Sequence, residues 1–316
     1  MKKILITGGA GAIGMHLARK LLHDGNFVYL ADNYIRSERD SSVLELIGHP
    51  HCKEIQIDLC DESEYVKLPL DIDYLFHLAA LNGTQNFYDI PFTVIENSTL
   101  PSIYLLKRYR DAKLKRFIYA GSSEGYASTV SKFDWPVPTD ETVPLCIDDP
   151  TNVRWSYAIS KVHGELACVA AAHEFNIDMT VVRYHNVYGI RMGDKHIIPD
   201  FIERANRGIY ELFGFEDTRT FIYVADAVEA TIMCANSPKT VNEIVNIGGK
   251  EEITMLEVGN KIMKILGRDQ EIICHPSPKG SVKRRAPDLT KLENLTGFTS
   301  SISIDEGLKI IIDSQS

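Results

Sequence analysis

The sequence lacks any run of apolar residues close to the roughly 18 that a membrane-spanning helix needs. Its first apolar run is short and turns into glycines at Gly8, unlike a secretory signal peptide. The six cysteines include no CxxC pair, and the ten histidines show no zinc-ligand spacing. We therefore expect a cytoplasmic protein with reduced thiols, no metal site and no membrane partner.

Basic residues are also in short supply. The chain of 316 residues carries 34 lysines and arginines against 43 acidic residues, for a formal net charge of −9. This balance argues against a nucleic-acid partner, because such proteins need a broad basic face. A hydrophobic content of 44% with 24% charged residues is ordinary for a soluble globular chain of one large or two smaller domains.

Short apolar runs alternate with amphipathic stretches over the first half of the chain. This alternation predicts a parallel sheet with helices on its faces, and right-handed crossovers make it doubly wound. The expected strands are Lys3–Thr7, Phe27–Ala31, Glu54–Ile57, Tyr74–Leu78, Arg116–Ala120 and Met179–Tyr184. The expected helices are Ile13–His23, Pro101–Asp111 and Tyr157–Glu174.

The alternation becomes irregular after Tyr184. We expect helices over Pro199–Arg207 and Ala225–Ala235, a strand over Thr220–Tyr223, and a strand over Glu243–Ile247 that returns to the main sheet. The predicted fold class is α/β, a doubly wound parallel (Rossmann) sheet with a smaller mixed α/β region. Residues 1–186 would form the dinucleotide-binding domain, with 220–247 partly returning to it, and residues 187–316 a discontinuous substrate-binding domain.

A glycine-rich turn joins the first expected strand to the first expected helix. Gly8 permits the tight turn, Gly11 lets the backbone approach a pyrophosphate, and Gly14 allows the helix to pack closely on the strand. Asp32 ends the second strand, where a carboxylate meets the ribose 2′-hydroxyl and repels a 2′-phosphate. We therefore expect NAD rather than NADP, although Arg36 and Arg39 follow closely enough to offset that repulsion.

A tyrosine and a lysine lie one helical turn apart at Tyr157 and Lys161. Removing hydride from a carbinol carbon requires a base that takes the hydroxyl proton in the same step. Lys161 and the positive nicotinamide ring would favour the phenolate of Tyr157. Ser122, at the end of a strand and followed by Ser123, would donate a hydrogen bond to the same substrate oxygen.

These motifs together resemble the extended short-chain dehydrogenase/reductases, specifically the NAD-dependent nucleotide-sugar epimerases and dehydratases. The resemblance rests on GxxGxxG, on His77-Leu78-Ala79-Ala80, on the strand and turn from Phe117 to Tyr126, and on YxxxK. It implies an enzyme of polysaccharide biosynthesis. The cofactor contacts it implies, together with those from the glycine turn, are Gly8, Gly11, Ala12, Ile13, Gly14, Asp32, Asn33, Asp58, Leu59, Leu78, Ala79, Ala80, Tyr157, Lys161 and Tyr184.

Three segments of the second half resemble the family's substrate clamp, which implies a nucleotide-diphosphate sugar as ligand. Asn186 matches the asparagine that binds the diphosphate, and Arg219 and Arg285 match arginines that reach the diphosphate or the sugar. Asp288 belongs to the same late motif, whereas Asp226 is expected to cap the following helix. Two guanidiniums and an amide suit a dianion, because the arginine fork matches phosphate oxygens in pairs.

The expected reaction opens with hydride transfer from carbon 4 of the sugar to bound NAD, which gives a 4-keto sugar. Glu124, in a turn similar to those of GDP-mannose dehydratases and UDP-glucuronate decarboxylases, could then remove the carbon 5 proton. A reaction at carbon 5 is therefore favoured, with 4,6-dehydration narrowly first. UDP-hexose 4-epimerisation and UDP-glucuronate decarboxylation stay open, and Glu124 as a mere loop-holding residue stays open too.

Two readings from other classes compete with this one. A non-catalytic NAD(P)-sensing protein would have no need of Ser122, Tyr157 and Lys161, and a simple carbonyl reductase would not need Asn186, Arg219 and Arg285. Many members of the family pair through two long helices of the sheet domain. We accordingly expect a homodimer built on the helices around Pro101–Asp111 and Tyr157–Glu174.

Overall fold

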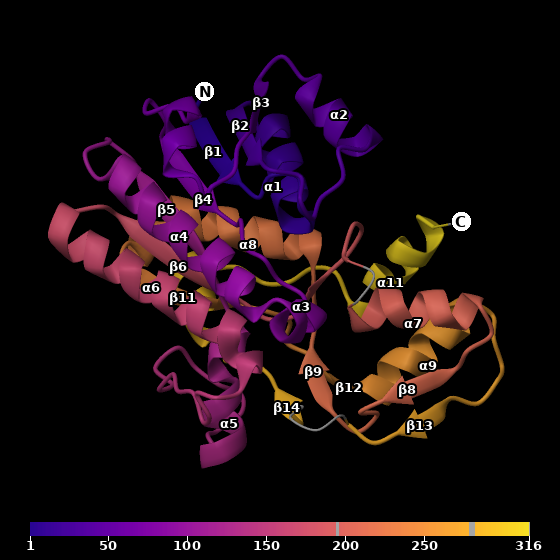
Figure 1. Cartoon of the computed structure of the whole chain (residues 1–316). Coiled ribbons are helices and arrows are strands. Elements are labelled where there is room, and N and C mark those ends of the chain that lie inside the picture. The colour runs from indigo at the N-terminus through magenta and orange to yellow at the C-terminus, as the bar shows by residue number, and fades with distance from the viewer. Residues whose placement is uncertain (194–195, 278–281, 316) are drawn as a thin grey trace. The chain divides into compact units, whose positions relative to one another are not determined.

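The computed structural model describes residues 1–193, 196–277 and 282–315, shown in Figure 1. These residues form two compact units. The first, here called the sheet unit, comprises Met1–Gly125, Asp149–Arg183 and Thr231–Val245. The second, here called the C-terminal unit, comprises Tyr126–Asp148, Tyr184–Ala230 and Asn246–Ser316. The sequence suggests that one domain binds the cofactor and the other binds the substrate, and this assignment stays a prediction.

A seven-stranded sheet organises the sheet unit, in the order β11-β6-β5-β4-β1-β2-β3. The four pairings from β3 through β2, β1 and β4 to β5 are parallel. This order confirms the doubly wound α/β fold and the return of Glu243–Ile247 to the main sheet. The strands are β1 (Lys3–Thr7), β2 (Phe27–Asp32), β3 (Cys52–Gln56), β4 (Tyr74–His77), β5 (Arg116–Ser122), β6 (Met179–Tyr184) and β11 (Glu243–Ile247).

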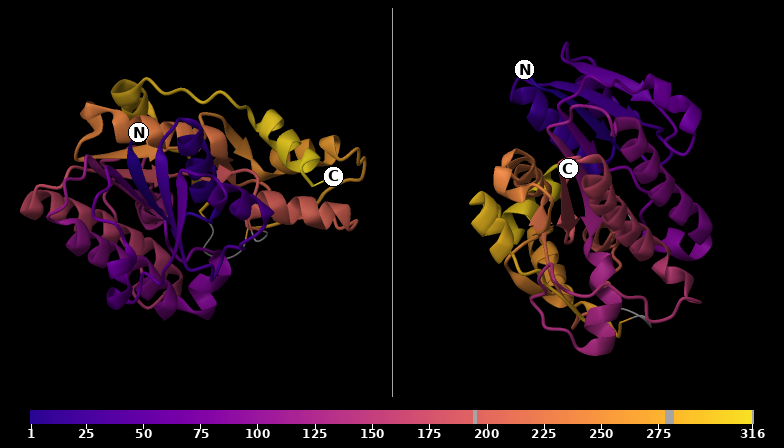
Figure 2. Two further views of the ribbon diagram at one scale, coloured as in Figure 1. Left: turned by 90° about the horizontal axis from the view of Figure 1, so that it is seen from above. Right: turned by 90° about the vertical axis from the view of Figure 1, so that its left-hand side faces the viewer.

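Helices cover the sheet, and two long ones, α4 (Pro91–Tyr109) and α6 (Ser156–Phe175), lie side by side (Figure 2). They pack on a core that includes Leu5, Leu75 and Phe117 from successive strands. Alternate residues of a strand point to opposite faces, so Ile4 and Ile6 of β1 are buried on the other side. The remaining elements of this unit are α1 (Ala12–His23), α2 (Ser41–Ile47), α3 (Thr84–Asp89) and short 3₁₀ helices at Glu62–Lys67, Val153–Trp155 and Pro238–Thr240.

The C-terminal unit contains three small sheets, with strand orders β10-β7, β12-β9-β14 and β13-β8. Its strands are β7 (Val187–Tyr188), β8 (Glu211–Phe213), β9 (Thr218–Thr220), β10 (Ile222–Tyr223), β12 (Glu252–Thr254), β13 (Ile273–His275) and β14 (Arg284–Arg285). Its helices are α5 (Ala127–Phe133), α7 (Ile197–Asn206), α9 (Met255–Ile265), α10 (Thr290–Thr296) and α11 (Ile304–Asp313). A turn at Ser123–Tyr126 and helix α8 (Val224–Asn236) run through the boundaries of the two units.

Two sequence predictions about elements were wrong. The helix expected to start at Pro101 begins ten residues earlier at Pro91, which takes the first-turn position that proline favours, and Pro101 is buried inside it. The strand expected over Thr220–Tyr223 is two strands that pair with different partners, β9 with β12 and β14, and β10 with β7. None of the helices within the described residues combines the length and hydropathy that crossing a bilayer demands.

Candidate active site

The glycine turn after β1 has the geometry of a pyrophosphate cradle. Gly8 has a φ of +68°, and a Cβ on it would lie 2.8 Å from the backbone nitrogen of Ala79. A Cβ on Gly14 would fall on the carbonyl oxygen of Gly8, so only glycine lets α1 start this close to the strand. Gly11 precedes α1 without a side-chain cap, and the first turn of α1 has no acidic residue. Its free amides therefore suit an anion.

Asp32 is buried at the end of β2 and is held by three donors. One carboxylate oxygen accepts from the Ala10 amide at 3.0 Å, and the other accepts from the Tyr34 amide and the Ser37 hydroxyl, each at 2.9 Å. Nearby, Arg39 forms a two-pronged ion pair with Glu54 at 2.8 and 2.9 Å. The charge of Arg39 is offset by Glu54 and is less available to attract the 2′-phosphate of NADP. Asp32 therefore fits NAD better than NADP.

The other predicted cofactor residues of the sheet unit are held mainly by local contacts. Leu78 donates its amide to the Thr7 carbonyl at 3.1 Å, which fixes the loop that continues through Ala79 and Ala80. Asn33 and Asp58 accept backbone amides two residues ahead, from Ile35 and Cys60. Leu59 belongs to the buried core. Tyr184, at the end of β6, falls in the C-terminal unit. The cofactor contacts of all these residues, and those of Ala12 and Ile13, stay predictions.

Tyr157 and Lys161 lie on the first turns of α6 and are buried, at 7% and 3% exposure. The Lys161 ammonium is 5.7 Å from the centroid of the Tyr157 ring, which confirms that the two side chains share a helix face. The ring of Phe87, from α3, stacks on Tyr157 at 5.2 Å with 10° between the planes. Phe87 was not singled out in the sequence, where nothing marks it apart from core aromatics.

Burial sets the titration of this pair. It raises the pKa of the Tyr157 phenol, and the Glu124 carboxylate raises it further, while Arg36 and the Ser122 hydroxyl lower it. Burial also lowers the pKa of Lys161 to about 8, although the carboxylate of Glu165 acts in the opposite direction. The sequence predicts that Lys161 lowers the pKa of the Tyr157 phenol. With the protein's side chains alone, that pKa is raised instead.

Three predicted catalytic residues, Ser122, Ser123 and Glu124, follow one another at the end of β5 and in the turn Ser123–Tyr126. Ser122 ends β5, and its hydroxyl oxygen accepts the amide of Glu124 at 3.2 Å. Ser123 is 3% exposed, and Glu124 receives the Nη2 of Arg154 at 3.3 Å. Arg154 was missed in the sequence analysis. Its position three residues before Tyr157 on a helical path was the available signal.

Replacing Glu124 with glutamine is expected to move the acid limb of the kcat/KM profile to lower pH. The Glu124 carboxylate raises the pKa of Tyr157 because it repels the phenolate, so removing its charge lowers that pKa. The base then forms at lower pH. Initial rates of the holoenzyme across a pH series measure the limb, and a shift to higher pH would contradict this electrostatic account.

A buried ion pair holds α6, the helix that carries Tyr157 and Lys161. Glu165 accepts from the Nε and Nη2 of Arg183 at distances between 2.8 and 3.1 Å, and the two side chains are 5% and 4% exposed. A Cβ on Gly121 would come within 2.6 Å of the Glu165 carboxylate, so this glycine leaves room for it beside β5. The pair joins α6, which carries Tyr157 and Lys161, to β6.

Two of the predicted diphosphate-binding residues are neighbours in the C-terminal unit. Arg219 on β9 and Arg285 on β14 are register partners in parallel strands. The Nη1 of Arg219 donates to the Thr218 carbonyl at 2.7 Å and its Nη2 lies 3.8 Å from Asp217. Arg284, next to Arg285, is instead tied to Glu252 at 2.7 and 2.8 Å.

Three further residues of this unit have contacts that hold its backbone. Asn186 has a φ of +38° and donates its side-chain amide to the Thr220 carbonyl at 2.9 Å. The Asp288 carboxylate accepts the Thr290 amide at the start of α10. The expectation that Asp226 caps a helix was wrong: it lies within α8 and accepts the amides of Ser301 and Ile302, each at 2.9 Å. Substrate roles for Asn186 and Asp288 stay predictions.

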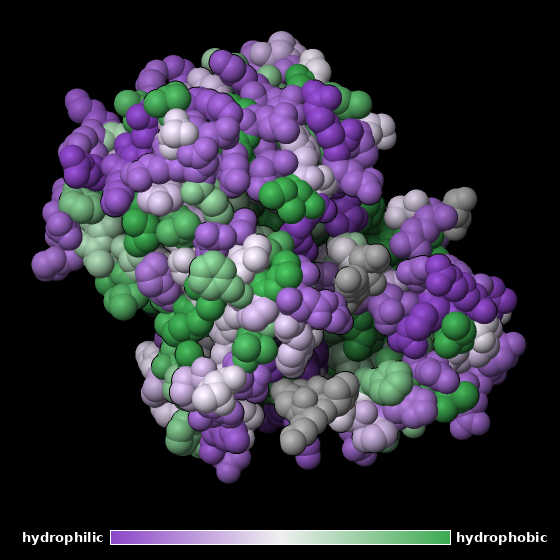
Figure 3. All heavy atoms as spheres, viewed as in Figure 1, coloured by the Kyte–Doolittle hydropathy of each residue, from purple (hydrophilic) through white to green (hydrophobic). Residues whose placement is uncertain are grey.

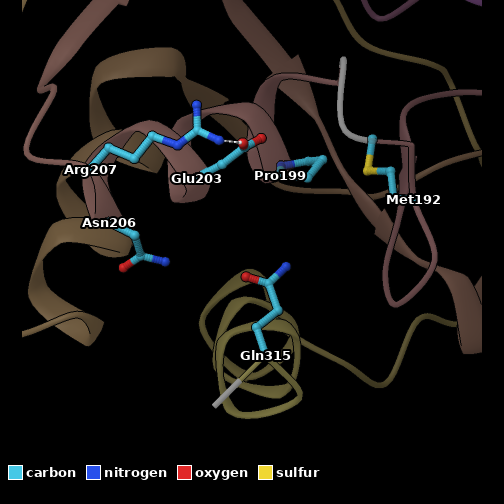
Figure 4. A pocket seen from close by; sticks show the side chains of 6 residues that line it. All are labelled: Met192, Pro199, Glu203, Asn206, Arg207 and Gln315. Atoms are coloured by element: carbon cyan, nitrogen blue, oxygen red, sulfur yellow. Dashed lines mark hydrogen bonds and ion pairs between the residues drawn. The ribbon is translucent and has the colours of Figure 1, made fainter.

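One pocket of about 400 Å³ in the C-terminal unit contains none of the predicted site residues (Figure 4). Its walls come from α7, from the residues before it and from the end of the chain. Arg207 and Glu203 on its rim already pair with each other. The lining residues are Met192, Pro199, Glu203, Asn206, Arg207 and Gln315.

Comparison with known proteins gives matches over most of the chain. The model of the NAD dependent epimerase/dehydratase family matches residues 4–248. A UDP-N-acetyl-alpha-D-glucosaminuronate decarboxylase of Bacillus cytotoxicus is 34% identical over 98% of this chain and 96% of its own length. UDP-glucuronic acid decarboxylase 1 of Danio rerio is 29% identical over 97% of this chain and 71% of its own. The crystal structure of UDP-glucuronic acid 4-epimerase from Bacillus cereus with UDP-glucuronic acid and NAD superposes with a TM-score of 0.87, at 26% identity, over 98% of each chain.

Proposed function

The chain belongs to the NAD-dependent epimerase/dehydratase family, and from this premise we propose that it decarboxylates a UDP-linked uronic acid. The observation that carries the choice is the ion pair of Glu124 with Arg154. Dehydration needs a carboxylate base for the carbon 5 proton, and pairing with a guanidinium weakens Glu124 in that role. A carboxylate β to a ketone leaves without such a base. Decarboxylation thus moves ahead of the dehydration that the sequence narrowly favoured.

The proposed cycle uses a proton relay, formed by Tyr157, Lys161 and Ser122, in both its first and its last step. Gly8, Gly11, Gly14 and Asp32 would hold NAD, which would supply the acceptor for the carbon 4 hydride and its donor for the closing reduction. The positive charge of its ring would favour the phenolate of Tyr157. Tyr157 takes the proton of the carbon 4 hydroxyl, while Ser122 donates a hydrogen bond to that oxygen. Lys161, buried beside the ring, stabilises the phenolate. Tyr157 gives its proton back to the oxygen when carbon 4 is reduced.

The middle step breaks the bond between carbon 5 and the carboxylate carbon. Its electron pair passes to the bond between carbons 4 and 5, giving an enolate, and carbon dioxide leaves. A proton from solvent then adds to carbon 5, and the carbonyl at carbon 4 re-forms before it is reduced. The substrate diphosphate is held in this proposal by Arg219, Arg285 and Asn186, with Asp288 supporting the segment of Arg285; the pairing of the two arginines on adjacent strands supports this assignment.

Product analysis in deuterated water tests the reaction. The holoenzyme is incubated with UDP-glucuronic acid, UDP-N-acetylglucosaminuronic acid and UDP-glucose, and the products are read by mass spectrometry and NMR. We expect one of the two uronic acids to lose carbon dioxide. The product should carry one deuterium from the solvent at carbon 5. Loss of water from UDP-glucose would contradict the proposal in favour of dehydration.

The second candidate is 4-epimerisation of a uronic acid, which the superposition with the Bacillus cereus 4-epimerase favours. Epimerisation keeps the carboxylate and transfers hydride to the other face of carbon 4. The same experiment separates it, because the product would retain its mass and carry no deuterium at carbon 5. We place either reaction in the cytoplasm, as a step of polysaccharide biosynthesis supported by the nucleotide sugars that the relatives use.

We also propose a homodimer formed by α4 and α6. Apolar side chains gather over these helices in Figure 3, and Phe92, Ile95, Leu166 and Val169 are 38 to 75% exposed there. Leu166→Glu should place a charge in the paired face and yield a monomer, measured by light scattering after gel filtration. Lys107→Glu, on α4 outside the apolar set, is the control. A dimer that survives Leu166→Glu would contradict this interface.

A further inference from the structure

We propose that Arg154 binds the carboxylate of the sugar through its Nη1 and thereby selects uronic acids over neutral hexoses. This inference rests on the proposed function and names the group that recognises its substrate class. Arg154 lies in the turn Val153–Trp155 that leads directly into α6, three residues before Tyr157. It is thus carried by the same stretch of backbone as the relay.

Two contacts fix the orientation of the Arg154 guanidinium. Its Nη2 donates to the Glu124 carboxylate at 3.3 Å, and its central carbon lies 4.6 Å from the ring of Trp155, over the indole face. The side chain is 13% exposed. The guanidinium is planar, so a contact at Nη2 and a contact on its flat face together fix the direction in which Nη1 points.

That remaining edge carries a donor without an acceptor. The Nη1 of Arg154 is buried and has no hydrogen-bond partner among the described residues. Leaving a buried donor without an acceptor is unfavourable, and more so for a charged group. A ligand atom that accepts from Nη1 would remove this cost, so the structure already holds the donor in place before the ligand arrives.

The position of Glu124 links this donor to the reacting sugar. The Glu124 amide donates to the Ser122 hydroxyl at 3.2 Å, and Ser122 is the proposed hydrogen-bond donor to the carbon 4 oxygen. Arg154, the guanidinium partner of Glu124, is therefore two contacts away from that oxygen. A carboxylate on carbon 5 is attached to the next ring carbon. The charge of Arg154 is already shared with Glu124, so the substrate carboxylate would be oriented without being held strongly enough to oppose its departure.

Binding measurements can separate recognition of the carboxylate from general shaping of the site. The binding measurements use the NAD-loaded Tyr157→Phe protein, which is expected to bind sugar with turnover at least about a hundredfold lower. Calorimetry gives its affinities for UDP-glucuronic acid and UDP-glucose. Adding Arg154→Met should lower the affinity for UDP-glucuronic acid about tenfold to a hundredfold, the range of one charged hydrogen bond. The affinity for UDP-glucose should not change. Arg154→Lys, which keeps the charge but not the fork, should lose less.

Arg110→Met, at an exposed arginine, is the matched control and should change neither affinity. Equal losses for both sugars, or a preference for the acid that survives both Arg154 substitutions, would overturn the inference while leaving the proposed function standing. A Tyr157→Phe protein that binds UDP-glucose as tightly as UDP-glucuronic acid would also overturn the inference. Failure of the wild-type holoenzyme to release carbon dioxide from either uronic acid would overturn the proposed function instead. Thermal unfolding of each variant verifies that it is folded, and Arg154→Lys carries the test if Arg154→Met is not.

Discussion

Tyr157→Phe is expected to lower turnover at least about a hundredfold, the low end of the loss when a general acid–base group is removed. The variant loses only the hydroxyl, so the ring keeps its stacking on Phe87 at 5.2 Å and its place in the cluster with Val94. Folding and NAD binding should therefore be retained. Because the phenol acts at both hydride transfers, neither the opening oxidation nor the closing reduction escapes its loss.

The measurement is kcat of the NAD-loaded variant on the uronic acid that the wild type turns over. Cofactor titration and a thermal unfolding scan run beside it as controls for binding and folding. Turnover within a few fold of wild type would remove Tyr157 from the reaction. Lost NAD binding would instead assign the ring a structural role in the cofactor site.

Arg183→Met is expected to destabilise the fold by about 3–5 kcal/mol, the cost of leaving one buried charge without its partner. Glu165 has its carboxylate almost fully buried and receives Arg183 through both Nε and Nη2. Methionine fills a similar volume but donates nothing. The double variant Arg183→Met/Glu165→Leu removes the orphaned charge as well and should recover much of the loss.

Urea unfolding gives these free energies. Arg207→Met, which breaks an exposed ion pair with Glu203, is the matched control and should cost less than about 1 kcal/mol. A single Arg183→Met variant as stable as this control would show that the pair contributes nothing to the fold. The double variant being no better than the single one would point to lost packing rather than to charge.

The parts of this site that the sequence predicted are those built from local spacing. The turn through Gly8 and Gly14 and the helical turn between Tyr157 and Lys161 are set by one stretch of backbone each. Asp32 could be placed because it ends a strand adjacent to the glycine turn. The glycine turn and the Tyr157–Lys161 spacing follow from neighbouring residues alone, and the structure has both. The position of Asp32 follows from the pairing of β2 with β1, the usual arrangement of this fold.

Features that depend on contacts distant in sequence were missed. The ion pair of Arg154 with Glu124 joins residues 30 positions apart. Arg219 and Arg285 could be assigned to one diphosphate only through the family resemblance, because no local pattern predicts that their strands pair. The start of α4 was misplaced because Pro101 resembles a first-turn proline, while tertiary packing buries it within a longer helix. Asp226 likewise bonds a segment 75 positions away, which no local pattern announces.

Rapid mixing of the NAD-loaded protein with UDP-glucuronic acid tests the central claim most directly, with UDP-N-acetylglucosaminuronic acid as the parallel sample. The near-ultraviolet absorbance of reduced nicotinamide should rise and then fall within each turnover, and carbon dioxide should appear after the rise. The Tyr157→Phe protein should show no rise on that timescale. Carbon dioxide released with no transient absorbance, or a transient unchanged by the substitution, would contradict oxidation at carbon 4 by this relay.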